Sequence, residues 1–359
     1  MSETSTFTLD ELLEHTFRSK ATDLHIAVGT PPMVRINAKL AIVEGYPPLT
    51  PQDTQSIVKG CTDELRKKTL EEKGEVDFSF SRHGLGRYRA NIFKQRGSYS
   101  MAIRSLPFAI PPFDSLGLPE SLRQVTKKKS GLVLATGSTG SGKSTTLASL
   151  IDIINSERRC HIITIEDPIE YLHRHKTGLV NQREVGWDTR SFASALRAAL
   201  REDPDVILVG EMRDAETIDI ALTAAETGHL VFSTLHTMGA AKTMNRIFDA
   251  FPHEQQMQVR TQLAAVLEAV VSQQLLAKKD GTGLVLATEM MLVNPAIRNL
   301  IREGKAHQVN TILQTSTGIG MHTMDASLAD LCSREIITFD DAMTRAQDVQ
   351  TFQQLCRRR

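Results

Sequence analysis

The chain has 359 residues, of which 41% are hydrophobic and 23% are charged, and its 42 lysines and arginines balance 42 aspartates and glutamates. This composition excludes a disordered or collagen-like chain and indicates a globular protein with room for two domains. The lack of a basic excess argues against a dedicated nucleic-acid binder. The four cysteines form no CxxC pair, so the sequence indicates neither a zinc site nor a disulfide framework.

Residues 1–106 have the pattern of a small α+β domain. Thr8 is suited to cap a helix over residues 8–19, where apolar residues recur at helical spacing. Strands are predicted over residues 23–29, 33–43 and 76–82, and across residues 86–106, where polar and apolar residues alternate. Four prolines between residues 107 and 119 exclude a helix or a central strand, so we place an interdomain linker at residues 107–119.

From Ser130 onward, short apolar strands alternate with helical stretches. The strands are predicted over residues 131–137, 161–167, 205–211 and 229–236. This alternation is typical of a parallel α/β sheet. We assign residues 120–285 to this core and residues 286–359 to a helical C-terminal region.

The most specific motif is the segment GSTGSGKS at residues 137–144, a GxxxxGK[ST] loop between a predicted strand and a predicted helix. Its glycines let backbone N–H groups and the helix N-terminus point at phosphates. Lys143 would supply positive charge at the β- and γ-phosphates of ATP, and Ser144 a hydroxyl ligand for Mg²⁺. The predicted nucleotide-binding residues are Gly137, Ser138, Thr139, Gly140, Ser141, Gly142, Lys143, Ser144 and Thr145.

Two acidic segments are predicted to reach the edge of the sheet that carries this loop. Glu211 follows a strand in a Walker-B-like position, suited to a role near Mg²⁺. Glu166, Asp167 and Glu170 follow the preceding strand, and three carboxylates so close repel one another unless a metal ion or a polarised water lies nearby. Glu166 or Glu170 is therefore the expected base that orients the attacking water. A solvated turn around Pro168 is the alternative interpretation.

Two histidines, His229 and His236, bracket the last predicted strand of the sheet. A histidine at a strand end can sense a γ-phosphate or reach a neighbouring subunit, although a lone histidine is more often structural. Their position on this sheet favours a functional role for His229 more than for His236.

In this order, GSTGSGKSTTL, TIEDPIEY, ALRAALREDPDVILVGEMRDAET and TAAETGHLVFSTLHT resemble the Walker A, Asp box, Walker B and His box segments of the secretion ATPase superfamily. The segments SKATDLHIAVGTPPMVRINAKL and AIRNLIRE resemble, within it, the type IV pilus retraction ATPases of the PilT type. The resemblance covers roughly residues 8–345.

The resemblance implies a homohexameric motor ATPase that uses ATP and Mg²⁺ to power pilus retraction, for twitching motility or DNA uptake. A PAS-like N-terminal domain would pack on the RecA-like P-loop domain of the next subunit, with ATP between them. The expected location is the cytoplasm, at the inner membrane beneath the pilus, with an inner-membrane platform protein and a PilU-type paralogue as partners and no nucleic acid.

The family's site residues carry over onto matching positions of this chain. They are the catalytic glutamate Glu170, the Walker B residue Glu211, the His-box pair His229 and His236, and the phosphate-contacting arginines Arg89 and Arg104, with Arg87 and Arg96 in second place. The alternative for the arginines is a solvated strand face. At residues 296–303, a helix with Arg298 and Arg302 on one side is either a coupling element or a packed surface helix.

Two other functions stay open at this point. One is an accessory PilU-like ring that assists another motor with little turnover of its own. The other is a nucleic-acid translocase built on the same core, which the neutral charge disfavours.

Overall fold

The computed structural model describes residues 8–36, 39–106 and 109–357, which form two compact units divided between Ala109 and Ile110. Residues 8–109 are called the N-terminal unit and residues 110–357 the C-terminal unit. Pro107, the start of the predicted linker, lies outside the described residues.

The N-terminal unit is an antiparallel sheet with helices, as its sequence pattern predicts. The sheet has six strands in the order β3-β2-β1-β6-β5-β4, and Thr8 caps α1 through a hydrogen bond from the backbone N–H of Glu11. Side chains on one face of the sheet, among them Leu24, Tyr88 and Ile103, are buried in a single apolar core. The elements are α1 (Leu9–Arg18), β1 (Asp23–Ile26), β2 (Met33–Ile36), β3 (Lys39–Ile42), α2 (Pro51–Cys61), α3 (Glu64–Lys73), β4 (Glu75–Arg82), β5 (Gly86–Gln95) and β6 (Ser98–Leu106).

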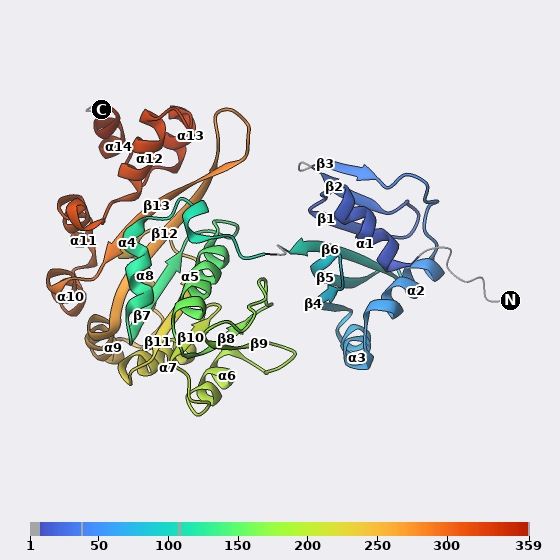
Figure 1. The fold of residues 1–359 in the computed structure, drawn as a ribbon, viewed down its shortest axis with the longest axis horizontal. Coiled ribbons are helices and arrows are strands. Elements are labelled where there is room, and N and C mark those ends of the chain that lie inside the picture. Colours follow the sequence, from blue (N-terminus) through green and yellow to red (C-terminus); the bar gives the residue numbers. More distant parts are fainter. Residues whose placement is uncertain (1–7, 37–38, 107–108, 358–359) are drawn as a thin grey trace. The chain divides into compact units, whose positions relative to one another are not determined.

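The C-terminal unit is built on a seven-stranded sheet in the order β13-β12-β7-β11-β10-β8-β9 (Figure 1). All neighbouring strands run parallel except β13, which is antiparallel to β12. Its elements are α4 (Glu120–Arg123), β7 (Gly131–Thr136), α5 (Lys143–Glu157), β8 (His161–Glu166), β9 (Leu179–Glu184), α6 (Phe192–Ala199), β10 (Val206–Val209), α7 (Ala215–Glu226), β11 (Leu230–Leu235), α8 (Ala240–Phe248), α9 (His253–Val266), β12 (Leu267–Ala277), β13 (Leu284–Leu292), α10 (Pro295–Arg302), α11 (Val309–Thr315), α12 (Met324–Ser333), α13 (Phe339–Arg345) and α14 (Val349–Arg357).

Both faces of this sheet are covered, which explains why its strands are continuously apolar. Leu132 and Leu134 of β7 belong to one buried cluster, with side chains of α6 to α10. Val133 and Ala135, which point the other way, belong to a second cluster with side chains of α5. Strand β7 is therefore anchored from both sides, and the loop that follows it starts from a rigid base.

Two predicted boundaries differ from the structure. The sequence pattern predicts helix at residues 286–292, but these residues form most of β13, because a short apolar run fits a buried strand as well as a helix. The helical C-terminal region begins at α10 instead. Within the predicted linker, Phe113 is buried in the core of the C-terminal unit and lies under the guanidinium of Arg123, so this part of the segment belongs to that unit.

Candidate functional site

The phosphate-binding loop joins the carboxyl end of β7 to the first turn of α5. Gly137, Gly140 and Gly142 have φ angles of +140°, +79° and +89°. Residues other than glycine rarely adopt such positive φ angles. A Cβ on Gly137 would also lie 2.4 Å from the backbone oxygen of Gln273 on β12, so only glycine fits there. The buried hydroxyl of Ser141 has no hydrogen-bond partner among the described residues. Such a loop, with an unpartnered donor and a helix N-terminus, fits a phosphate group.

Lys143 holds its ammonium group inside this loop. Its Nζ donates to the backbone oxygens of Gly137 at 2.9 Å and Ser138 at 2.8 Å, and the residue is only 8% exposed. Burial lowers the pKa of Lys143, while the nearby carboxylates of Glu170 and Glu211 act in the opposite direction. The cation and two carboxylates therefore share one site, although Glu170 and Glu211 follow Lys143 by 27 and 68 residues along the chain.

Glu211 lies just beyond β10, at the carboxyl edge of the sheet, and is 8% exposed. Its Oε1 pairs with Arg213 at 2.5 Å, and its Oε2 lies 3.6 Å from Nε2 of His236. That Oε2 is buried and has no hydrogen-bond partner among the described residues. An unpartnered carboxylate oxygen near the loop lysine and the exposed Ser144 suits a hydrated cation.

Among the residues that the structure describes, no group of three or more His, Cys, Asp or Glu side chains could hold a metal ion. A Mg²⁺ ion at the Ser144 and Glu211 positions would therefore depend on phosphate oxygens and water for its other ligands. This is the usual mode for Mg²⁺ in nucleotide-hydrolysing enzymes.

The acidic segment after β8 has its carboxylates in different environments. Glu166 accepts hydrogen bonds at Oε1 from Thr164 at 2.6 Å and from Nε2 of Gln182 at 3.1 Å. Glu170 instead interacts electrostatically with Lys143. The neighbouring hydroxyl of Tyr171 is 2.8 Å from Oγ1 of Thr145, in the first turn of α5. Of the two carboxylates that the sequence left open, Glu170 is the one whose charge acts on the pKa of Lys143.

The two histidines lie at opposite ends of β11. Residue 230 pairs with Gly131 at the start of β7, whereas Leu235 pairs with Thr136 next to the phosphate-binding loop. His229 therefore sits at the amino edge of the sheet, about 20 Å from the loop at 3.3 Å per residue, with its Nδ1 2.9 Å from the backbone oxygen of Ala224. His236, the histidine ranked second, is the one beside Glu211.

The predicted arginines belong to the N-terminal unit. Arg89 on β5 and Arg104 on β6 are directly paired across the two strands, and both point away from the core. Arg89 forms an ion pair with Asp77 at 2.6 Å, and Arg104 one with Asp23 at 2.9 Å. Burial would raise the pKa of Asp23, but hydrogen bonds from Thr22 and Arg104 bring it below its usual value.

The two secondary arginine candidates have other environments. Arg87 donates to the hydroxyls of Ser79 and Ser81. Arg96 lies in the turn between β5 and β6 with a φ of +49°, followed by Gly97 at +78°, as a tight hairpin turn requires. A phosphate contact from Arg89 or Arg104 remains a prediction.

Sequence reasoning missed the contribution of β9. Gln182 and Glu184 contact the segment that carries Glu170, and both lie on the same face of the strand as the buried Val180. Polar residues at inward-facing strand positions are the signal that could have identified them.

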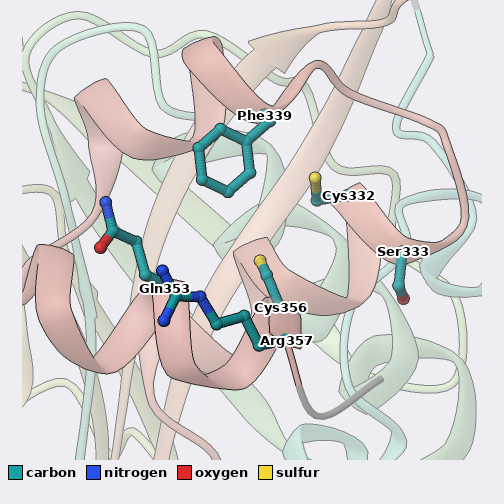
Figure 2. A pocket seen from close by; sticks show the side chains of 6 residues that line it. All are labelled: Cys332, Ser333, Phe339, Gln353, Cys356 and Arg357. Carbon is teal, nitrogen blue, oxygen red and sulfur yellow. The ribbon is translucent and has the colours of Figure 1, made fainter.

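A pocket of about 470 Å³ lies apart from this site, among α12, α13 and α14. Figure 2 shows the six residues that line it, and no predicted site residue is among them: Cys332, Ser333, Phe339, Gln353, Cys356 and Arg357. The phosphate-binding loop, Glu170 and Glu211 lie at the carboxyl edge of the sheet instead.

Known proteins with similar sequences and structures connect this site to one family. The sequence profile of the type II/IV secretion system proteins matches residues 115–283. PilT of Pseudomonas aeruginosa, described as a type IV pilus retraction ATPase, is 46% identical over 96% of this chain and 99% of its own length. This chain belongs to the PilT family of secretion ATPases. A crystal structure of the pilus retraction motor PilT with bound ADP matches 97% of this chain and 99% of that chain, with a TM-score of 0.92 and 51% identity.

Membership in the PilT family establishes an ATPase with the two-domain α/β fold of the secretion ATPases. PilU of Pseudomonas aeruginosa, a type IV pilus ATPase, is also similar, at 40% identity over 94% of this chain and 88% of its own length. No helix within the described ranges is both long and apolar enough to span a membrane.

Proposed function

We propose that this PilT-family ATPase is a hexameric motor that hydrolyses ATP to retract type IV pili, in twitching motility or DNA uptake. The observation that carries the proposal is the convergence of Lys143, Glu170 and Glu211 at the carboxyl edge of one sheet. The proposed setting is the cytoplasmic side of the inner membrane at the pilus base. There the ring would act on a platform protein, with a PilU-type paralogue as a further partner.

The proposed chemistry assigns one task to each residue of the site. The loop N–H groups and Lys143 bind the β- and γ-phosphates and oppose the charge that develops on them during transfer. Ser144 and Glu211 would hold Mg²⁺, which when bound neutralises phosphate charge. Glu170 orients the attacking water and accepts its proton.

The N-terminal unit would complete the site of a neighbouring subunit. The side chain of Arg104 is 70% exposed, and among the described residues its guanidinium pairs with Asp23 through Nε, so its other N–H groups can donate to a phosphate. Arg89 lies directly beside it. Together they would form a paired cationic surface of the kind that stabilises a transferring phosphoryl group.

Hydrolysis by purified protein tests the site assignments. Glu170→Gln should bind ATP but lose hydrolysis, because an amide of the same shape cannot accept the proton of water. Glu211→Gln should lower hydrolysis and shift the Mg²⁺ titration. Glu157→Gln, an exposed carboxylate at the far end of α5, is the matched control and should leave activity unchanged. Normal turnover by Glu170→Gln would refute its role.

The PilU-like accessory alternative is distinguished by turnover. A principal motor hydrolyses ATP on its own, whereas an accessory ring would do so only slowly in the absence of its partner. A nucleic-acid translocase would be stimulated by saturating DNA, and we expect no stimulation.

A further inference from the structure

The loop between β8 and β9 carries Glu170 and is held by hydrogen bonds to the side chain of Gln182 on β9. Nε2 of Gln182 donates to Oε1 of Glu166 at 3.1 Å and to the backbone oxygen of Tyr171 at 2.9 Å. Oε1 of Gln182 accepts from the backbone N–H of His173 at 2.7 Å. The amide therefore holds the loop on both sides of Glu170, four residues before it and one and three residues after it.

The orientation of this amide is determined by its partners. The N–H of His173 can only donate, and the backbone oxygen of Tyr171 can only accept. If the amide of Gln182 were reversed, a donor would face a donor and an acceptor would face an acceptor. Only a side chain with an acceptor and a two-hydrogen donor at the same place satisfies all three partners.

A second side chain of the same strand supports the loop. Glu184, two residues after Gln182, is 7% exposed, and its Oε2 accepts from the backbone N–H of Ile169 at 3.1 Å. Residues 169 and 171 are thus both held by β9, and Glu170 lies between them. β9 is the edge strand next to β8 (Figure 1), so no further strand of this sheet competes for the space its side chains occupy.

Polar side chains at inward-facing positions are costly unless their hydrogen bonds are satisfied. Gln182 and Glu184 share a strand face with the buried Val180, where an apolar side chain would stabilise the core more simply. Hydrogen bonds from both side chains reach the loop that carries Glu170, at Ile169, Tyr171 and His173. Their placement is explained by a need to fix that loop.

We propose that Gln182 is a positioning residue for ATP hydrolysis, which sets the place of the Glu170 carboxylate relative to the phosphate-binding loop. The proposal rests on the assigned role of Glu170. Gln182 touches neither the phosphate-binding loop nor Lys143 in any described contact, so its effect should fall on turnover and leave ATP binding unchanged.

Steady-state ATP hydrolysis and the binding of a fluorescent ATP analogue separate these two effects. Gln182→Ala should lower kcat by about 10- to 100-fold, the range expected when a reacting group is displaced by about 1 Å. The Kd of the analogue should stay within about two-fold of the parent value. Asn181→Ala, an exposed neighbour on the opposite face of β9, is the matched control and should change neither quantity.

A second variant covers the case in which Gln182→Ala does not fold. Gln182→Glu keeps the size of the side chain and the acceptor for His173, but it cannot donate to Tyr171 and it places a charge against Glu166. Its kcat should fall as in Gln182→Ala. Adding Gln182→Ala to Glu170→Gln should lower the residual kcat no further, because Gln182 acts through Glu170.

The outcomes distinguish this inference from the proposed function. If Glu170→Gln turns over normally, the assignment of Glu170 fails and this inference fails with it. If Glu170→Gln is inactive while both Gln182 variants keep the parent kcat, only the positioning role is refuted. A further loss of kcat in the double variant, or a parallel loss of analogue binding, would show that Gln182 serves the fold in general and would also overturn the proposal.

Discussion

Replacing Arg298 on α10 should destabilise the C-terminal unit, because this side chain links α10 to the end of α9 and to Glu268. Nη1 of Arg298 donates to the backbone oxygens of Ala264 and Ala265 at 2.6 and 2.7 Å, and Nη2 pairs with Glu268 at 2.7 Å. The two carbonyls lie in the last turn of α9, where a cation also favours the helix dipole.

The expected decrease in the free energy of unfolding follows from these contacts. A hydrogen bond to a charged group contributes about 1.5–3 kcal/mol when buried, but the Arg298 side chain is 26% exposed and water can replace part of the loss. Lys128 also keeps its own ion pair with Glu268 at 2.7 Å. We expect Arg298→Ala to cost about 3 kcal/mol, which corresponds to a melting temperature about 6–12 °C lower for a unit of this size.

Thermal unfolding of purified protein measures this effect, with Arg302→Ala as the control. Arg302 is exposed one turn later on the same helix, so its removal should change stability by less than about 0.5 kcal/mol. Equal melting temperatures for the two variants would refute the reasoning. The sequence-based expectation that both arginines are available for coupling therefore applies to Arg302 alone.

Three further predictions concern the site. Rings mixed from Arg104→Ala and Lys143→Ala subunits should regain hydrolysis if Arg104 acts on a neighbour's nucleotide, and no regain at any mixing ratio would contradict that role. Tyr171→Phe, which loses the hydrogen bond to Thr145, should lower kcat about five-fold, the equivalent of about 1 kcal/mol, with an unchanged kcat as the contrary result. Burial lowers the pKa of His173 to about 4, so the folded protein should lose up to about 3 kcal/mol as pH falls from about 6.5 to 4, and thermal unfolding of His173→Gln should depend less on pH over that range.

The local motifs of the sequence were sufficient to predict the phosphate-binding loop and most strands of the large sheet. Eight consecutive residues specify this loop, and the sequence shows its glycines, its lysine and the start of the following helix directly. The placement of His229 and His236 followed from strand direction, and parallel pairing puts only the carboxyl end of β11 beside the loop. The sequence contained this information, because the direction of the strand alone places His236 at the carboxyl edge and His229 at the amino edge.

Other elements depend on contacts between distant parts of the chain. Arg298 reaches carbonyls 33 and 34 residues away, and no periodicity within α10 reveals that contact. Gln182 bonds a loop that precedes it by 9 to 16 residues, through a side-chain amide whose partners are mostly backbone groups. The sequence of β13 does not reveal a strand, because its central residues are buried and polar and apolar positions alternate only weakly there.

Counting surface pili tests most directly whether ATP hydrolysis at this loop powers pilus retraction. Cells that lack the gene should accumulate pili that do not retract, and the parent chain should restore retraction while Lys143→Ala should not. Cells without any pili would indicate an extension motor instead. Normal retraction with Lys143→Ala would show that hydrolysis at this loop is not the source of the force.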